Sequence, residues 1–469
     1  VVTDPAHIVA NALGGTIQLQ ATRRVDLTTA VLDASGEGGG GRIHIQADGV
    51  PTPADNPTQA PVKGVVLLST NTVLRANSAR AHAGRVEVEG DDISLDTGTL
   101  IEAKGATQGG TVLVGGDWQG SGAMRQATTV TLSADSTIDA SATDNGDGGK
   151  VVLWSAVDNT SSVTTAYGTI NAKAGANGGD GGVVETSGHH LILDGYRVST
   201  ESAYGLSGLW LLDPYDIAIG TTVSGTAFSS SGTDYIYTSA AGSYITASSI
   251  ATALASTNVT IQTGSGGTGY GDILLNSPIS YAGSATTTLT LKASRNIFLN
   301  EAISSSNGKL NLVVTSDHDN NSSGDQIRVG GNVTTLGGNG TFTGENIVFQ
   351  GVAGQTISTV RTGETGGSFT VNGSTFLAVY NGATAANLVL NTGGGAVNFN
   401  STIDSGNQYT FVDDSAITST SGVDNWTKAQ SDAQLKGGYL VTITSSLENM
   451  LASAASLQNG SYRGAWIGI

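Results

Sequence analysis

A short motif, in which small residues lead into a segment of alternating apolar and polar residues, returns throughout the first half of the chain. It reads GGTIQLQ at 14–20, GGRIHIQ at 40–46, GRVEVEG at 84–90, GGTVLVGG at 109–116 and GGKVVLW at 148–154. An apolar period of two is typical of a strand with one face buried. Because glycine stands at the entrance to every copy, we expect the chain to make a similar sharp turn each time.

A second, shorter element precedes several copies of this motif and keeps step with it. The interval from Ile138 to Ile170 equals the interval from Val151 to Val183, so the two elements form one repeating unit. The element combines an apolar residue, an acid or Asn, and Ala, as in VLDASG at 31–36, LIEAKG at 100–105, TIDASA at 137–142 and TINAKAG at 169–175.

The repeat continues in the second half of the chain with other residues. GDILLNSPIS at 271–280 aligns with SRNIFLNEAIS at 294–304, and looser copies stand at 324–333, 344–352 and 385–399. Short strands that return about every 20–40 residues between Gly, Asn and Asp turns are typical of a β-solenoid, in which stacked coils share one apolar interior. A set of β-sandwiches also has short strands, but it would not repeat one local motif in this way.

The composition narrows the class of protein further. The chain has 469 residues, 67 of them Gly, and a net charge of −18. The negative charge argues against nucleic acid as a partner, because nucleic-acid affinity depends on Lys and Arg. The absence of Cys excludes disulfides and a cysteine nucleophile. The first residues already resemble the middle of the repeat, so we expect them to belong to a longer mature protein.

The pattern breaks between residues 184 and 220, where Tyr196, Tyr204, Trp210 and Tyr215 gather in a chain that is poor in aromatic residues. They could form an exposed groove for sugar, but a packed junction between two stretches of coils is favoured, because large aromatic side chains stabilise a core most. The adjacent His189 and His190 should point to opposite faces of a strand, which argues against a shared metal ion.

Four segments are expected from these changes in pattern. Residues 1–220 form a first β-helix segment, and residues 221–260 form an irregular junction with a short helix within 246–257, where Ile250 and Leu254 share a helical face. Residues 261–421 form a second β-helix segment, and residues 422–469 form a tail of different character.

Several segments resemble the filamentous haemagglutinin type of surface exoprotein: GGTVLVGGDWQG at 109–120, GDGGKVVLW at 146–154, AGANGGDGGVVETSG at 174–188 and LWLLDPYDIAI at 209–219. This resemblance implies a right-handed parallel β-helix in an all-β chain. It also implies export by two-partner secretion through a dedicated outer-membrane transporter of a Gram-negative bacterium. The protein would then be extracellular, secreted or attached to the outer membrane surface, with a role in adhesion.

The tail from 422 to 469 resembles the opening half of a C-type-lectin-like domain, a partial α+β segment. Its landmarks are Trp426, the run GGYLVTI at 437–443, the pair Glu448 and Asn449, and AWIGI at 465–469. The sugar- and calcium-binding residues of that family lie in its later half, so the resemblance places no binding residue in this tail.

One loop is a candidate calcium site. Asp317, Asp319, Asn321 and Asp325 present oxygen atoms at spacings that suit a hard cation, although the bidentate Glu of an EF-hand loop is missing. The other interpretation is a solvated polar turn, and the same interpretation is favoured for the weaker Asp- and Asn-rich turn at 144–148. Apart from calcium at this loop, we expect no cofactor.

The sequence predicts no catalytic residues, and we expect no enzyme. Glu87 and Glu89 share an outward face behind Arg85, but no partner for them is evident along the strand. The favoured function is an adhesin rod that presents regions binding a cell-surface or matrix polysaccharide or glycoprotein. The alternatives are a self-associating extracellular matrix or filament protein, as in a biofilm, and a β-helical enzyme that degrades polysaccharide.

Overall fold

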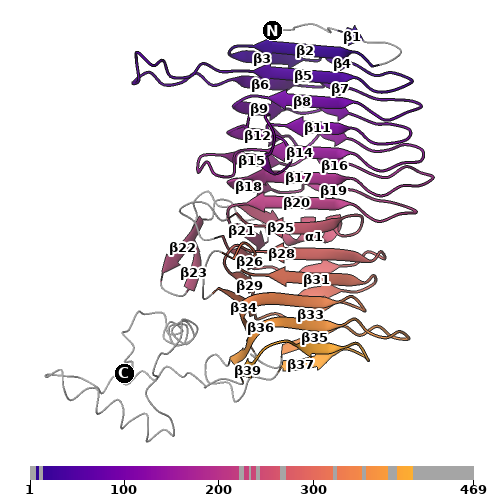
Figure 1. Cartoon of the computed structure of the whole chain (residues 1–469), viewed down its shortest axis with the longest axis vertical. Coiled ribbons are helices and arrows are strands. Elements are labelled where there is room, and N and C mark those ends of the chain that lie inside the picture. Colours follow the sequence, from indigo (N-terminus) through magenta and orange to yellow (C-terminus); the bar gives the residue numbers. More distant parts are fainter. Residues whose placement is uncertain are drawn as a thin grey trace, which may run out of the picture.

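The computed structural model describes residues 7–9, 14–220, 227–231, 234–238, 243–264, 271–320, 325–350, 355–378 and 388–404. In these residues the chain winds into a parallel β-helix, whose coils lie on top of one another along the long axis (Figure 1). The β-solenoid predicted from the repeats is thus confirmed. The tail at 422–469 lies outside the described residues, and the four-segment division stays a prediction.

A first ladder of strands runs the length of the described coils. Each strand pairs in parallel with the next one. The ladder consists of β2 (Thr16–Ala21), β5 (Arg42–Ala47), β8 (Arg85–Glu89), β11 (Thr111–Val114), β14 (Lys150–Trp154), β17 (Val183–Gly188), β20 (Leu209–Pro214), β25 (Asn258–Gln262), β28 (Thr287–Lys292), β31 (Leu310–Thr315), β34 (Gly340–Gln350), β36 (Phe369–Ala378) and β38 (Val397–Phe399).

A second ladder follows the first one in each coil. It contains β3 (Arg24–Thr28), β6 (Val65–Ser69), β9 (Asp92–Leu95), β12 (Thr129–Leu132), β15 (Val163–Ala166), β18 (His190–Leu193), β24 (Tyr244–Thr246), β21 (Ile217–Gly220), β26 (Ile273–Leu275), β29 (Ile297–Leu299) and β32 (Gln326–Val329). It then continues through the later parts of β34 and β36 to β39 (Ile403–Asp404). Strand β24 pairs with β18 on one side and with β21 on the other, although it follows both of them in the sequence.

The third side of the coils is divided in two. One sheet contains β1 (His7–Val9), β4 (Val31–Asp33), β7 (Val73–Arg75), β10 (Leu100–Glu102), β13 (Thr137–Asp139), β16 (Thr169–Asn171) and β19 (Arg197–Ser199). The other contains β27 (Ile279–Tyr281), β30 (Ile303–Ser305), β33 (Val333–Thr334), β35 (Gln355–Ser358) and β37 (Leu388–Asn391). Helix α1 (Ala247–Ala253) contacts both β19 and β27, so it takes the place of a strand between the two sheets.

The helix expected within 246–257 is therefore confirmed. It begins after Thr246, whose side chain accepts a hydrogen bond of 3.2 Å from the Ser249 backbone N–H, as an N-cap does. The helices in the described part of the chain are too short and too polar to cross a membrane. Outside the coil body, β22 (Ala227–Ser231) and β23 (Asp234–Thr238) form an antiparallel hairpin.

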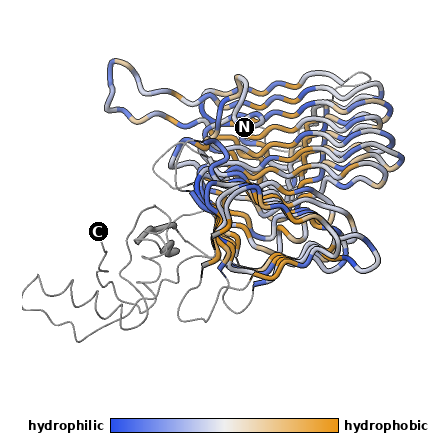
Figure 2. Tube along the Cα trace, turned by 60° about the horizontal axis from the view of Figure 1, so that its bottom comes forward, coloured by the Kyte–Doolittle hydropathy of each residue, from blue (hydrophilic) through white to orange (hydrophobic). Residues whose placement is uncertain are grey.

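Inward-facing apolar side chains stack from coil to coil and form one core. Apolar residues follow the inner side of the coils (Figure 2). The predicted alignments of Ile138 with Ile170, and of Ile273 with Ile297, are confirmed by the strand register. The alignment of Val151 with Val183 is wrong by one residue, because the register pairs Val151 with the buried Val184. The turn before β17 is one residue longer, and the strand keeps its apolar face inward.

The recurring glycine is explained by close contact between coils. At the turn into each strand of the first ladder from β5 to β20, a Cβ atom would lie about 2 Å from the carbonyl oxygen of the matching glycine one coil earlier. No side chain fits in that space. We call this column the glycine ladder; its members are Gly41, Gly84, Gly110, Gly149, Gly182 and Gly208.

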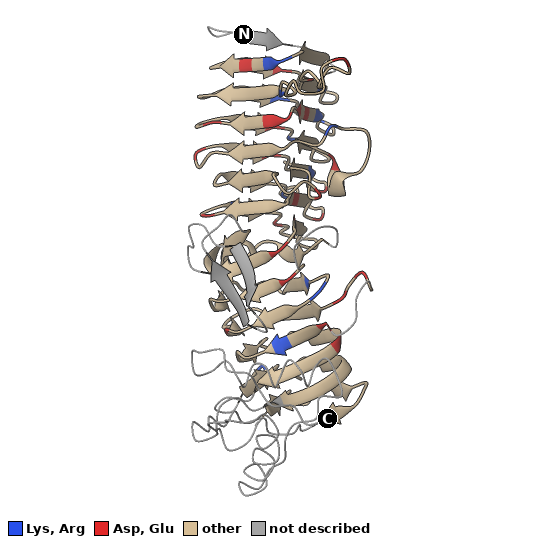
Figure 3. Cartoon of the chain, turned by 90° about the vertical axis from the view of Figure 1, so that its left-hand side faces the viewer, with Lys and Arg blue, Asp and Glu red and all other residues tan. Residues whose placement is uncertain are grey.

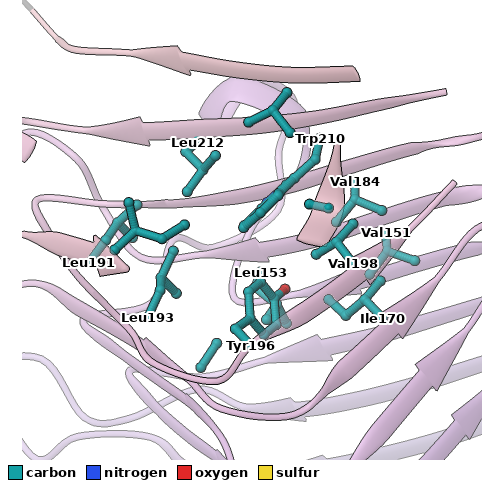
Figure 4. Packing of buried hydrophobic residues seen from close by; sticks show 14 of the residues in the cluster. Val151, Leu153, Ile170, Val184, Leu191, Leu193, Tyr196, Val198, Trp210 and Leu212 are labelled. Atoms are coloured by element: carbon teal, nitrogen blue, oxygen red, sulfur yellow. The ribbon is translucent and has the colours of Figure 1, made fainter. Parts of the chain in front are cut away.

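Three of the four aromatic residues of 184–220, namely Tyr196, Trp210 and Tyr215, are buried, in agreement with the favoured packed arrangement. That they mark a junction between two stretches of coils stays a prediction. Trp210 and Tyr196 are buried, their ring centroids lie 5.5 Å apart, and both have their polar atoms 3.2 Å from the Thr186 hydroxyl (Figure 4). Tyr204, by contrast, is exposed. A groove that uses all of these aromatic residues is therefore not formed.

The two adjacent histidines do not point to opposite faces. Their ring centroids lie 4.7 Å apart, and the His189 ring also stacks on Tyr215. The prediction failed because His189 is not in a strand: β17 ends at Gly188 and β18 begins at His190, so the chain bends between the two side chains.

Candidate functional site

Most strand positions carry no Lys, Arg, Asp or Glu (Figure 3). Strands β5 and β8 are an exception, because their sequences RIHIQA and RVEVE contain Arg42, His44, Arg85, Glu87 and Glu89. Ile43, Ile45, Val86 and Val88 point inward, so the residues between them point outward. The parallel register places Arg42 beside Arg85 and His44 beside Glu87. We call the residues Arg42, His44, Arg85, Glu87 and Glu89 the charged cluster.

Glu87 holds the two arginines of the cluster together. Its Oε2 atom accepts a hydrogen bond of 2.6 Å from Arg42 Nε, and its Oε1 atom accepts one of 2.6 Å from Arg85 Nε. The Glu87 side chain is 8% exposed, whereas those of Arg42 and Arg85 are 50% and 40% exposed. Burial alone would raise the pKa of the Glu87 carboxyl, but Arg85 and Arg42 outweigh it and hold that pKa below its ordinary value.

Glu89 joins the cluster to the loop between β11 and β12. Its Oε1 atom lies 2.7 Å from His44 Nε2, and its Oε2 atom accepts a hydrogen bond of 3.0 Å from the Arg125 backbone N–H. The Arg125 guanidinium in turn donates to the Asp48 carbonyl and the Asp91 carboxylate. We call residues 116–126, which include the 3-10 helix η1 (Trp118–Gly120), the strap. It is fastened across several coils.

The sequence alone made no partner of Glu87 and Glu89 evident. Their hydrogen-bond partners come from the preceding coil, 45 residues away in the sequence, from the strap and, for Glu87, from Arg85 of the same strand. A signal was present, since Arg42 and Arg85 occupy the same position of the repeat, directly after Gly41 and Gly84. Alignment of these two copies would have placed the arginines side by side.

A hollow of about 510 Å³ lies beside the cluster, where the glycine ladder leaves the surface without side chains. Glycines from four successive coils line it, and no Asp or Glu does. We call it the glycine hollow. The larger side chains that line it are those of Thr16, Arg42, His82, Arg85, Gln108 and Thr111.

Buried acids lie beneath the strap. Glu185 is fully buried; its carboxylate accepts hydrogen bonds of 2.8 Å from the Gln119 backbone N–H and 2.9 Å from the Ser187 hydroxyl. Burial, with a smaller effect from the charge of Asp213, raises the pKa of Glu185 to about 7. Burial and the nearby Asp158 raise the pKa of Asp213 to about 7 as well. Asp213 Oδ1 is buried and accepts no hydrogen bond from any residue that the structure describes.

Apolar contacts also fasten the strap. Leu113, Val152 and Trp154 point outward from β11 and β14 and are buried, and Trp118 and Met124 of the strap pack on them. Trp154 Nε1 donates a hydrogen bond of 3.2 Å to the Gln126 side chain. The strap thus covers the outer face of β14 and β17, where the buried Glu185 lies.

The candidate calcium loop is only partly described. Asp317, Asp319 and Asp325 lie among the described residues, and Asn321 lies outside them. Within the described ranges, no group of three or more His, Asp or Glu residues is placed to hold a metal ion. Calcium binding at 317–325 therefore stays a prediction.

The polar turn at 144–148 stabilises the stacking of neighbouring coils. Asp144 Oδ1 accepts a hydrogen bond of 2.6 Å from the Asn177 side chain, and Asp147 Oδ1 accepts one of 2.8 Å from the Asp180 backbone N–H. Asp180 in turn accepts from the Leu206 N–H, one coil further on.

Comparison with known proteins adds no relative. No family model matches the chain, and no curated protein matches it.

Proposed function

We propose that this chain is a section of an extracellular adhesin rod, which extends from a Gram-negative bacterial surface and presents binding regions for attachment to cells, surfaces or matrix. The observation that carries the proposal is the unbroken parallel ladder from β2 to β38. With about 4.8 Å per coil, it spans on the order of 60 Å. A rod of stacked coils holds the segments that protrude from its side at a distance from its point of attachment.

The described coils carry a segment that protrudes from the side of the rod. An arm at residues 50–62 leaves the coil body between β5 and β6 (Figure 1). Val50 and Val62 close its base with backbone hydrogen bonds of 2.7 and 2.8 Å. Four of the 7 prolines of the chain lie in the arm, and proline restricts the backbone, so a contact made here loses little conformational entropy.

The export route belongs to the same proposal. The resemblance of segments at 109–120, 146–154, 174–188 and 209–219 to filamentous haemagglutinin-type exoproteins supports two-partner secretion through an outer-membrane transporter. A chain without Cys suits this route, because no disulfide can lock the fold before export.

Beads coated with the purified chain test the adhesive function. They should be retained under flow on cells and on surfaces coated with matrix polysaccharide, whereas beads coated with the heat-unfolded chain should wash off. A variant whose arm at 50–62 is replaced by a short turn separates the arm from the rod. Retention no better than that of beads coated with an unrelated protein of similar charge would contradict the proposal.

A self-assembling filament is the second candidate, and one observation favours it. Val389, Val397 and Ile403, in the last described coils, are 43%, 43% and 55% exposed. Exposed apolar residues close together on a surface favour association. Sedimentation velocity at increasing protein concentration distinguishes the two candidates: end-to-end growth supports the filament, and a constant monomer supports the rod.

A further inference from the structure

The glycine hollow differs in charge from the rest of the molecule. Acids outnumber Lys and Arg by 38 to 20 in the chain, yet no acid lines the hollow and two half-exposed arginines do. The two arginines share the buried carboxylate of Glu87, the carboxylate of Asp117 lies 3.9 Å from Arg85 Nη2, and Glu89 is paired with His44. Two guanidinium groups that share one buried carboxylate, with their outer parts half exposed, can hold a further negative charge at the hollow.

Both arginines are held in place before any ligand arrives. Glu87 accepts from the Nε atom of each and also contacts Arg42 Nη2, while a guanidinium has five N–H donors. The remaining donors belong to side chains that stay 50% and 40% exposed. Because Arg42 and Arg85 are register partners on adjacent strands, their guanidinium groups can hold one carboxylate between them.

The floor of the hollow selects the kind of ligand. The backbone N–H groups of Arg42, Arg85 and Thr111 already donate to Gly15, Gly41 and Gly84 of the preceding coil, at 2.9, 2.8 and 3.0 Å. A peptide could not pair with this backbone as an added strand. A flat, hydroxylated ring can lie against the bare glycines and reach the Thr16 and Thr111 hydroxyls and the Gln108 amide.

We infer that the glycine hollow binds a linear polysaccharide that carries carboxylates, a chain of uronic acids, with a carboxylate held by Arg42 and Arg85. Three steps between four coils give the hollow about 14 Å along the rod, which admits a short run of sugar rings. The inference deepens the proposed adhesive function and rests on it, since it names the class of polymer to which the rod attaches.

Binding of polygalacturonate to the full chain tests the inference, with fully methyl-esterified polygalacturonate as the uncharged control. Arg42→Gln and Arg85→Gln should each weaken binding about tenfold or more, since each removes a charge-assisted hydrogen bond. Arg24→Gln is the matched control, because Arg24 is 52% exposed and paired with Asp26 outside the hollow. Equal binding of the esterified polymer, or undiminished binding by both cluster variants, would overturn the inference.

Thr111→Trp provides a variant that leaves the contacts of Glu87 intact. A bulky ring at this position fills the hollow, so polygalacturonate binding should be lost while the melting temperature is kept. Tighter binding of a sulfated polysaccharide through the same arginines would overturn the choice of carboxylate. If the bead assay fails but polygalacturonate binds in a way that depends on the arginines, only the adhesive function is contradicted. If the beads are retained but polygalacturonate binding does not depend on the arginines, only the binding site in the glycine hollow is contradicted.

Discussion

At the scale of single residues, the absence of a side chain lets the coils from β2 to β20 stack closely at their turns. The members of the glycine ladder need glycine because the carbonyl of the preceding coil occupies the space of a Cβ atom. The same bare backbone forms the floor of the glycine hollow. One residue choice thus serves both the stacking of coils and the surface that we propose binds sugar.

Gly84→Ala tests this contact. The new Cβ would lie 1.9 Å from the Gly41 carbonyl oxygen, a backbone atom that cannot move without shifting a coil. We expect the free energy of unfolding to fall by about 3 kcal/mol, as for an overpacked core, measured by chemical denaturation. At Gly264 the nearest atom is 3.5 Å away, so Gly264→Ala should change stability little. Equal effects of the two substitutions would contradict the steric explanation.

Glu185 should make stability depend on pH in an unusual direction. Burial raises the pKa of its carboxyl to about 7 from 4.5, so between these values the folded state binds more protons than the unfolded state. Stability therefore falls as the pH rises from 4.5 through about 7, by up to about 3 kcal/mol from this group.

Denaturation at pH 5 and pH 8 tests this dependence. The loss of stability between pH 5 and pH 8 should be smaller in Glu185→Gln than in the unchanged chain. Part of the loss should remain in this variant, because the pKa of Asp213 is also raised to about 7. Glu37→Gln is the control, since the Glu37 side chain is 72% exposed. An identical pH dependence in all three proteins would refute the role of Glu185.

At the scale of elements, the strap is an insertion fastened at both of its ends. Trp118 and Met124 pack on outward apolar residues, Gln119 donates to Glu185, and Arg125 reaches Asp48 and Asp91. These contacts join strands of several coils, so the strap stabilises neighbours that are distant in the sequence.

Arg125→Ala should loosen the strap without unfolding the coils. Loss of the contacts to Asp48 and Asp91 should raise the rate of limited proteolysis within 116–126 about tenfold, with the far-ultraviolet circular dichroism unchanged. Arg24→Ala removes a surface arginine elsewhere and should leave the rate unaltered. Cleavage at the original rate in Arg125→Ala would show that the apolar contacts alone fasten the strap.

Local patterns could be predicted from the sequence, and contacts between distant coils could not. The alternation around Ile43 and Val86 predicts strands and their buried face, and the spacing of Ile250 and Leu254 predicts α1. Nothing near Ile250 shows that this helix replaces a strand between β19 and β27, since that depends on residues some 30 to 50 positions away. Glu185 was missed for the same reason, because its burial results from a strap that enters the chain 66 residues before it.

At the scale of the whole molecule, each coil contacts mainly the coils next to it, and the strap is an exception that reaches further. Stability in such a stack is close to a sum of coil energies and interfaces between adjacent coils. A fault in one coil should therefore spread only a short distance along the stack.

Val151→Asp places a charge in the core of the coil that contains β14. Hydrogen exchange followed by mass spectrometry should show loss of protection that is largest in β11, β14 and β17 and fades toward β2 and β31. Val183→Asp places the same charge on an outward-facing position and should alter exchange less. Uniform loss of protection across all described coils would contradict a one-dimensional stack.

Helix α1 leaves one level of the rod with a weaker connection than the others. Above and below it, strands pair on all three sides of the coils, but between β19 and β27 the helix packs on the third side, where one hydrogen bond of 3.0 Å runs from the Thr200 backbone N–H to the Thr257 hydroxyl. When the two ends of the rod are pulled apart, the tensile load passes through this level. We expect the coils to separate first at α1, while the coils on either side of it stay folded.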